Sequence, residues 1–354
     1  MILVAPTSFK GTLSARAAAE AMAAGARAGV AHHVVTAPLS DGGPGLIDAL
    51  EFKADRIEKV RVSGPLGARV NARVLWRGKQ AVIESADACG LHLVPEQQRD
   101  PWRSTTRGVG ELIAHAAESA DEIVVGLGGS ATVDGGIGMA VALDWQALDA
   151  GAVAITPVAA DLHRLARLVA GQRRFAGQIT ALADVVTPLV GPHGAARVFG
   201  PQKGVPPTQI DRLDAALKQL ADVIARDLGK QIHAMPAGGA AGGLGAAMAA
   251  FLNARVRSGS EWVLEQVDFD GMLARASLLV TGEGSYDAQS SLGKITGVVI
   301  QRAAARGVPV LLIAGHVEGR LPEHVHAPKH PGRELTAIDL ERMVRAHCAR
   351  LLHT

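Results

Sequence analysis

The hydrophobic pattern at the start of the chain predicts a strand, a helix and a second strand. The apolar run at residues 2–5 is typical of a buried strand, and the alanine-rich segment 14–28 is typical of a helix that Ser14 caps. A second strand is expected at residues 33–38. Because a helix usually joins two neighbouring parallel strands, this opening favours a parallel α/β sheet.

The pattern changes at about residue 56. Short valine-containing runs follow as far as residue 86, and the glycine-containing turns at residues 64–67 and 77–79 separate them, which indicates β-hairpins. A helix is expected at residues 108–119, and a longer amphipathic helix at residues 210–228, where apolar side chains recur at helical spacing. This part of the chain is therefore expected to form a mixed α/β domain.

The pattern of the opening returns near the end of the chain. Residues 278–280 form an apolar run that meets Thr281-Gly282-Glu283-Gly284, which has the composition of a turn. A helical run to Arg306 and an apolar strand at residues 308–314 follow.

The fold class predicted from these patterns is two-domain α/β. Residues 1–55 and 270–354 are expected to form one discontinuous, Rossmann-like domain with a parallel sheet. Residues 56–269 are expected to form an inserted mixed α/β domain with glycine-rich loops. At 354 residues the chain is long enough for two such cores.

The segment from Gly126 to Met139, with the sequence GLGGSATVDGGIGM, is the strongest local indication of function. It follows an apolar strand at residues 122–125 and precedes an alanine-containing helix, so we expect unpaired backbone N–H groups at the helix start, where phosphate binds well. The candidate phosphate or metal contacts of this segment are Gly128, Gly129, Ser130, Thr132 and Asp134.

Composition and charge exclude several classes of partner. The formal net charge is +2, without a basic stripe, so nucleic acid is not an expected partner. No apolar run is long enough to span a membrane, and no signal peptide precedes the first strand, so a cytoplasmic location is expected. Cys89 and Cys348 stand alone, and the histidines lack ligand spacing, so no histidine or cysteine metal site is expected. The oligomeric state stays open.

Charged residues beside glycine-rich or strand-end segments are candidates for chemistry. Lysines in such turns can neutralise phosphate oxygens, and acids after apolar strands can orient a hydroxyl or hold magnesium. A solvated loop lysine, an aspartate that bonds its own turn and a helix cap are the competing interpretations. The candidates are Lys10, Lys203 and Lys294 for phosphate, Asp41 and Asp184 after strands, and Glu283 and Asp287 near the end of the chain.

Other nucleotide-binding motifs are absent or incomplete. The chain has no GxxxxGK[ST] motif and no protein-kinase motifs. Residues 126–131 satisfy a loose dinucleotide fingerprint. The fingerprint also needs an acidic residue at the end of the next strand, about 20 positions later, but the run at residues 152–156 ends in Pro157. An NAD(P)-dependent oxidoreductase is therefore kept only as a weaker alternative.

Several separated segments together resemble the class I glycerate kinases. The resemblance extends over about residues 1–315, in matching order and rough spacing. It implies a two-domain α/β fold with the active site in the cleft between the domains, ATP and Mg²⁺ as cofactors, and transfer of phosphate to a hydroxyl of a small hydroxy acid. The matching segments include residues 5–15, 41–43, 64–67, 105–113, 126–139, 198–204, 240–246 and 281–284.

The chain departs from the family pattern at several polar positions. Thr7 replaces an aspartate, Thr187 an asparagine and Ser285 an arginine of the family. Because an arginine can hold a carboxylate through two parallel N–H bonds and a serine cannot, these changes bear on the substrate. Under the resemblance, Asp184, Lys203 and Lys10 are expected to be catalytic. A homologue with an altered substrate, or one that binds without turnover, is the alternative.

Overall fold

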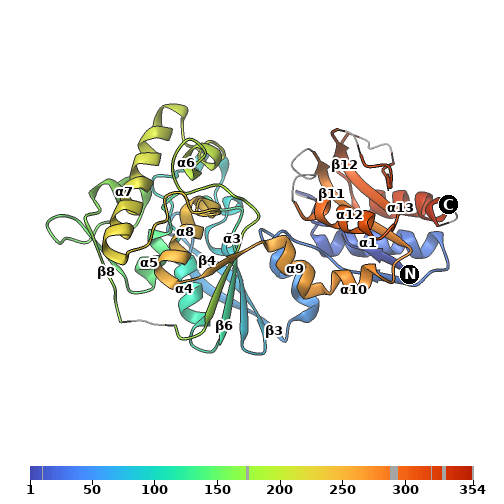
Figure 1. The fold of residues 1–354 in the computed structure, drawn as a ribbon, viewed down its shortest axis with the longest axis horizontal. Helices are drawn as coiled ribbons and strands as arrows, with labels where there is room; N and C mark the ends of the chain where they lie inside the picture. The colour runs from blue at the N-terminus through green and yellow to red at the C-terminus, as the bar shows by residue number, and fades with distance from the viewer. Residues whose placement is uncertain (10, 173–174, 288–293, 320, 329–331, 353–354) are drawn as a thin grey trace. The chain divides into compact units, whose positions relative to one another are not determined.

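The computed structural model describes residues 1–9, 11–172, 175–287, 294–319, 321–328 and 332–352. The chain divides into two compact units (Figure 1). Unit 1 comprises Met1–Asp41, Asp48–Phe52 and Ser258–Thr354, and unit 2 comprises Gly42–Ile47 and Lys53–Arg257. Unit 1 is discontinuous in the chain, and its last segment begins at Ser258, whereas the sequence-based boundary was placed after position 269.

Unit 1 is built on a parallel sheet. Within the described residues its strand order is β13-β12-β11-β1-β2, and each neighbouring pair is parallel. The core lies between this sheet and helices that include α1 and α13, which pack closely enough that a Cβ on Gly25 would meet the Glu341 carbonyl at 2.2 Å. The strands are β1 (Ile2–Val4), β2 (Val34–Thr36), β11 (Leu278–Tyr286), β12 (Val310–Val317) and β13 (Val325–His326).

Local sequence signals explain where the helices of unit 1 begin. The Ser14 side chain accepts a hydrogen bond from the Ala17 amide at the start of α1, as the sequence predicts. Thr336 and Asp339 form a reciprocal capping box at the start of α13. The helices of this unit include α1 (Ala15–Gly29), α9 (Gly259–Val267), α10 (Phe269–Leu273), α12 (Ile295–Ala305) and α13 (Ala337–Leu351), and α2 (Leu46–Leu50) crosses the division.

One expected turn of unit 1 is a strand instead. Residues 281–286 continue β11 and pair in parallel with β12 as far as Tyr286 and Val317. The Thr281 hydroxyl donates to the Ala5 carbonyl at 2.7 Å, and a Cβ on Gly282 would meet the Ile313 carbonyl at 2.2 Å. The glycine is needed for close packing of extended backbone, so the prediction of a turn here is wrong.

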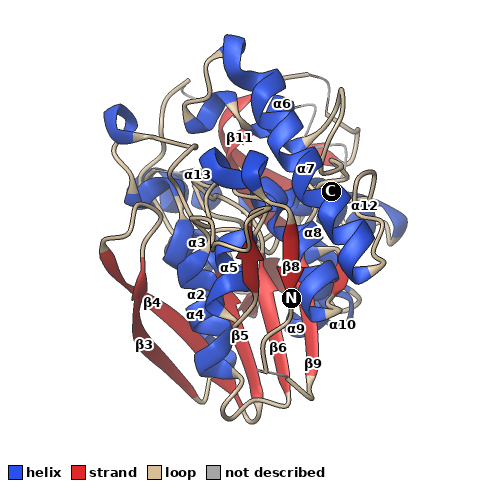
Figure 2. Ribbon diagram, turned by 90° about the vertical axis from the view of Figure 1, so that its left-hand side faces the viewer, coloured by secondary structure: helices blue, strands red, loops and turns tan. Residues whose placement is uncertain are grey.

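Unit 2 contains a mixed sheet, and Figure 2 shows its longer strands side by side. Its order within the described chain is β10-β9-β6-β5-β4-β3, with antiparallel pairing of β3, β4 and β5 and parallel pairing of β5, β6, β9 and β10. The hairpins predicted for residues 56–86 are confirmed. The strands are β3 (Arg56–Ser63), β4 (Arg69–Arg77), β5 (Gln80–Glu84), β6 (Glu122–Gly126), β9 (Gln178–Leu182) and β10 (Arg255–Arg257), and β7 (Gln146–Leu148) pairs separately with β8 (Arg167–Val169).

The helices of unit 2 bury their apolar faces in one core. The amphipathic helix predicted at residues 210–228 is confirmed with the same bounds, and the apolar positions of the pattern are buried except Ile210 and Leu228 at its ends, which are partly buried. None of the helices described here is long and apolar enough to cross a membrane. The helices are α3 (Ser85–Cys89), α4 (Arg107–Ala116), α5 (Ile137–Ala142), α6 (Ala195–Phe199), α7 (Ile210–Leu228) and α8 (Ala240–Leu252).

Candidate functional site

The candidate residues of unit 2 gather at one edge of its sheet. Strands β5, β6 and β9 run parallel, and the register pairs Glu84 with Gly126 and Gly126 with Leu182. The segments that leave these strands therefore start from the same carboxyl edge, where α/β sheets present groups to ligands. Asp184 follows β9 by two positions, and the glycine-rich segment follows β6, so the fold brings both predicted features to this edge.

The glycines at the end of β6 accommodate another part of the chain. A Cβ on Gly126 would meet the Gly42 carbonyl at 2.2 Å, a Cβ on Gly128 would lie 3.0 Å from the Gly43 Cα, and one on Gly129 would lie 2.5 Å from Pro44. Gly129 also has a positive φ of 63° and is exposed. Close packing against Gly42–Ile47 is therefore a reason for these glycines that the sequence did not reveal.

Asp134 accepts four hydrogen bonds and is fully buried. Its Oδ2 accepts from the Thr106 amide and hydroxyl, both at 2.8 Å, and from the Gly138 amide at 3.2 Å, while Oδ1 accepts from the Gly136 amide at 3.0 Å. Burial raises the pKa of Asp134, and these hydrogen bonds oppose that shift. The carboxylate joins the start of α4 to the glycine-rich segment, and both its oxygens are engaged within the protein.

The start of α5 is consequently not an open anion site. The Gly136 and Gly138 amides donate to Asp134, and the Met139 amide donates to the Thr106 hydroxyl at 3.0 Å. The prediction that these amides are unpaired is wrong, because the protein's own carboxylate and hydroxyl occupy the position expected for phosphate. The part of the segment that reaches the surface is Gly128 and Gly129.

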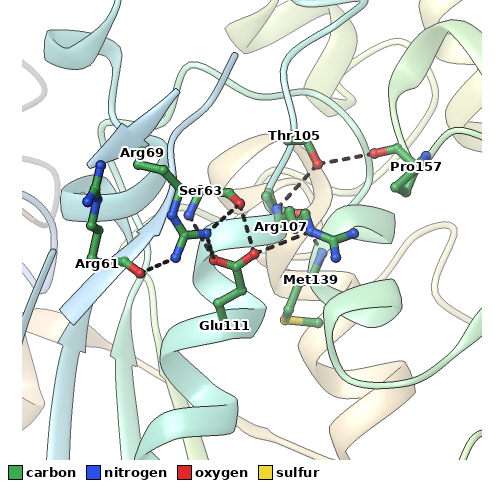
Figure 3. A network of polar contacts seen from close by, with 9 residues as sticks. Arg61, Ser63, Arg69, Thr105, Arg107, Glu111, Met139 and Pro157 are labelled. Carbon is green, nitrogen blue, oxygen red and sulfur yellow. Dashed lines mark hydrogen bonds and ion pairs between the residues drawn. The ribbon is translucent and has the colours of Figure 1, made fainter. Parts of the chain in front are cut away.

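A polar network holds the start of α4 against β3 (Figure 3). Glu111 accepts from the Ser63 amide and hydroxyl, both at 2.8 Å, from Arg69 at 3.1 Å and from Arg107 at 3.3 Å. The Thr105 hydroxyl donates to the Pro157 carbonyl at 3.2 Å. These contacts flank Thr106 and so fix the donor that Asp134 uses.

Lys203 lies beneath the glycine-rich segment. It ends a 3₁₀ turn (Pro201–Lys203), is 3% exposed, and donates from Nζ to the Ser130 hydroxyl at 2.9 Å and to the Thr132 carbonyl at 2.8 Å. Burial lowers the pKa of Lys203 to about 8. Lys203, Ser130 and Thr132 were separate candidates from the sequence, and the fold brings them into contact, with the ammonium facing the protein's own loop.

The other candidates of unit 2 lie on the segment after β9. Asp184 is partly buried, while Val186 beside it is 83% exposed. The Thr187 carbonyl accepts from the Gly239 amide at 2.9 Å, which connects this segment to the start of α8. A Cβ on Gly242, whose φ is 71°, would meet the Thr132 carbonyl at 1.9 Å. Close contacts with two other segments therefore constrain the backbone around Thr132 and Thr187.

The candidates of unit 1 lie on β11 and the segments beside it. The Thr7 amide and hydroxyl both donate to the Gly282 carbonyl, at 2.9 and 3.3 Å. Glu283 is partly buried and Ser285 is exposed on β11, and Ser285 pairs in register with His316. Lys294, at the N-cap of α12, lies 3.8 Å from Asp287, while Asp41 is exposed and Lys10 lies outside the described residues.

No group of three or more histidine, cysteine, aspartate or glutamate side chains suited to a metal ion occurs among the described residues. Magnesium is often held by one or two carboxylates together with substrate phosphates, so such a group is not required. Asp134 does not fit this role because both its oxygens are engaged. Asp41, Asp184 and Glu283 keep a share of their surface exposed.

Two groups at this edge were not singled out from the sequence. Glu84 is 3% exposed at the end of β5, and Thr106 is fully buried at the start of α4. A charged residue that ends an apolar strand was a visible signal for Glu84. Nothing in the sequence around Thr106 indicated that it pairs with Asp134, because that contact joins segments 28 residues apart.

Comparison with known proteins identifies the class of this protein. A model of the Glycerate kinase family matches residues 2–330. Glycerate kinase of Bacillus subtilis (strain 168) is 41% identical over 326 residues, which cover 89% of this chain and 85% of the relative. Glycerate 2-kinase of Escherichia coli (strain K12) is 41% identical over 322 residues, covering 89% and 84%. The matches define a phosphotransferase of the kinase type that acts on a hydroxyl group.

A solved structure agrees with this class. The crystal structure of a "putative glycerate kinase 2" from Salmonella typhimurium LT2 has a TM-score of 0.83 and 39% identity, covering 99% of this chain and 97% of that one. The chain belongs to the glycerate kinase family. The predicted family and the α/β fold class are confirmed, ATP is the phosphate donor that the family implies, and the kinase interpretation is favoured over the oxidoreductase.

Proposed function

We propose that this protein transfers the γ-phosphoryl group of ATP to the 2-hydroxyl of glycerate, forming ADP and 2-phosphoglycerate. The observation that carries the proposal is similarity over nearly the whole chain to proteins named glycerate kinase, one of them glycerate 2-kinase. The cytoplasmic location expected from the sequence is part of the same proposal, since the reaction consumes ATP.

The residues of unit 2 suit the binding and orientation that phosphoryl transfer requires. Asp184, at the carboxyl edge of the sheet, would orient the attacking hydroxyl and accept its proton. The exposed backbone of Gly129, together with the partly exposed Gly128, would lie against phosphate oxygens. Lys203 would act on the same loop from beneath, because its ammonium holds Ser130 and the Thr132 carbonyl in place.

The residues of unit 1 supply charge of both signs. Lys294 would contact phosphate, and the facing Asp287 sets its position through the 3.8 Å ion pair. Lys10 stays a candidate from its glycine-rich sequence context alone. Mg²⁺, when bound to the nucleotide phosphates, would neutralise charge that develops during transfer. Of the proposed acids, Asp41 and Glu283 are the ones we assign to it, since Asp134 is committed to the fold.

The test is a coupled assay of ADP release with purified protein, D-glycerate and ATP. Phosphorus NMR of the product distinguishes 2-phosphoglycerate from 3-phosphoglycerate. Turnover with a signal from the 2-phosphate supports the proposal. A folded protein that binds ATP but releases no ADP with D-glycerate contradicts it, and omission of Mg²⁺ in a parallel reaction tests the metal assignment.

An altered acceptor is the second candidate, and the exposure of Ser285 on β11 favours it. A serine there offers one neutral donor where an arginine offers a charged pair of N–H groups. Thr7 and Thr187 are the other changed positions, and they face Gly282 and Gly239 through hydrogen bonds. Comparison of D-glycerate, glycerol and longer hydroxy acids decides this point, because efficient turnover selective for glycerate excludes the altered acceptor.

A further inference from the structure

Glu84 is a buried acid at the candidate edge that no role described above uses. It is the last residue of β5, follows an apolar run at residues 81–83, and is 3% exposed. Burying a carboxyl group costs free energy unless hydrogen bonds compensate for the lost water. The position would be filled at lower cost by an apolar side chain of similar volume if packing were its only role.

The carboxyl group of Glu84 binds the backbone of a distant segment. Its Oε2 accepts from the Gly45 amide at 3.0 Å and from the Ile47 amide at 3.4 Å, across 39 and 37 positions of the chain. Both amides belong to Gly42–Ile47, the short stretch of unit 2 that the chain enters from Asp41. One side chain therefore satisfies two donors of this stretch.

The same stretch lies on the glycines that end β6. A Cβ on Gly126 would meet the Gly42 carbonyl at 2.2 Å and the Leu46 side chain at 2.7 Å. A Cβ on Gly128 would lie 3.0 Å from Gly43. Because the register pairs Glu84 with Gly126, these two residues sit next to each other on adjacent strands, and both contact the segment Gly42–Ile47.

The charged groups that face Glu84 are occupied with each other. Arg73 binds Asp87 through Nε at 2.7 Å and through its terminal nitrogen at 3.1 Å. This pair packs beside Glu84 from β4 and α3, and it carries no net charge. The Glu84 carboxyl group instead accepts hydrogen bonds from the Gly45 and Ile47 amides.

We propose that Glu84 is a positioning residue for the phosphotransfer: it holds Gly42–Ile47 on the glycines of β6 and so fixes the loop that begins at Asp41. This inference rests on the proposed function for its kinetic part. Its structural part, the attachment of Gly42–Ile47, does not depend on which substrate is used.

The test compares four variants with the wild-type protein. Glu84→Ala removes the acceptor, Glu84→Asp withdraws it by one methylene group, and Glu84→Gln keeps an oxygen acceptor without charge. Glu122→Gln is the matched control, because Glu122 lies at the opposite end of the same pair of strands and accepts from Gln80 at 2.8 Å. Deuterium exchange of peptides covering Gly42–Ile47 is measured together with kcat and KM.

In Glu84→Ala and Glu84→Asp, the backbone amides of Gly42–Ile47 are expected to exchange with deuterium at least about tenfold faster than in wild type. We expect their kcat to fall about tenfold or more, while Glu84→Gln stays within about threefold and Glu122→Gln changes neither quantity. If Glu84→Ala does not fold, the contrast between Glu84→Asp and Glu84→Gln carries the test.

Two results overturn the inference. Wild-type exchange and kcat in folded Ala or Asp variants would show that Glu84 does not hold the segment. Loss of kcat in Glu84→Gln with normal exchange would show that the charge itself is required, which is a chemical role. A wild-type protein that does not phosphorylate glycerate would contradict the proposed function, whereas the exchange result would still decide the attachment.

Discussion

The ammonium of Lys203 and the hydroxyl of Ser130 lie 2.9 Å apart inside unit 2, although 73 positions of the chain separate them. The same ammonium donates to the Thr132 carbonyl at 2.8 Å, and Lys203 is 3% exposed. A single buried cation thus joins the turn at Pro201–Lys203 to the glycine-rich segment after β6. The geometry of that segment depends on this contact.

Lys203→Met is therefore expected to reduce kcat/KM by an amount equivalent to about 2–4 kcal/mol, as for loss of one preorganised electrostatic group. Ser130→Ala should reduce kcat/KM by a smaller factor. The double variant should have the same kcat/KM as Lys203→Met alone, because both substitutions remove the same Lys203–Ser130 contact. Lys218→Met is the control, since Lys218 pairs with Asp222 on the exposed face of α7. Steady-state kinetics of the four proteins measure this, and strictly additive losses would contradict a shared contact.

Asp134→Asn is expected to destabilise the protein by about 3–5 kcal/mol, because the amide group cannot accept all the bonds that Asp134 accepts in a buried site. Only one side-chain oxygen would remain, so part of the Thr106, Gly136 and Gly138 donors would lose their acceptor. Urea denaturation measures the free energy of unfolding. Normal stability combined with a changed requirement for Mg²⁺ would instead assign Asp134 to the metal.

Gly242→Ala should destabilise the protein more than Gly229→Ala. Both glycines have positive φ, 71° and 67°, so both variants bear the backbone strain of about 1–2 kcal/mol. A Cβ at position 242 would also meet the Thr132 carbonyl at 1.9 Å, whereas one at position 229 has nothing within 4 Å. Thermal unfolding of the two variants isolates the clash, and equal losses of stability would show that Thr132 moves away freely.

Glu84 should make stability depend on pH. Burial raises the pKa of Glu84 from 4.5 to about 7, so the folded protein binds this proton more readily than the unfolded chain. The contribution of the site is therefore largest at low pH and falls as the pH rises from 4.5 to about 7. Relative to Glu84→Gln, which has no such proton, the free energy of unfolding of wild type should fall by up to about 3 kcal/mol between about pH 4.5 and pH 7. Urea denaturation of both proteins at each pH measures this, and a constant difference would contradict it.

The predictions from sequence succeeded where short-range patterns determine structure. The spacing of apolar positions predicted α7 with its observed bounds, and Ser14 was recognised as the N-cap of α1. The segment at residues 281–286 was wrongly expected to turn, because its glycines suggested freedom of φ. Gly282 instead allows β11 to pack closely, a requirement imposed by the Ile313 carbonyl on the neighbouring strand β12.

In the candidate site, too, local patterns identified residues but did not identify their contacts. Asp134, Ser130, Thr132 and Lys203 were named from local composition, but their partners were not, since Thr106 and Lys203 come from distant segments. The glycine-rich segment was expected to offer open amides to phosphate. In the fold, Asp134 takes those amides, and Gly42–Ile47 covers Gly126 and Gly128.

The sequence by itself determined the α/β class, the family, many of the strands, several helices including α1 and α7, and the segments from which site residues come. These features follow from hydrophobic spacing, helix caps and glycine turns, all of which act over a few residues. Only the tertiary structure decided which polar groups face one another: Asp134 with Thr106, Lys203 with Ser130, and Glu84 with Gly45. Such pairings depend on strand order and register, because a buried donor or acceptor must find its partner wherever the fold brings one close.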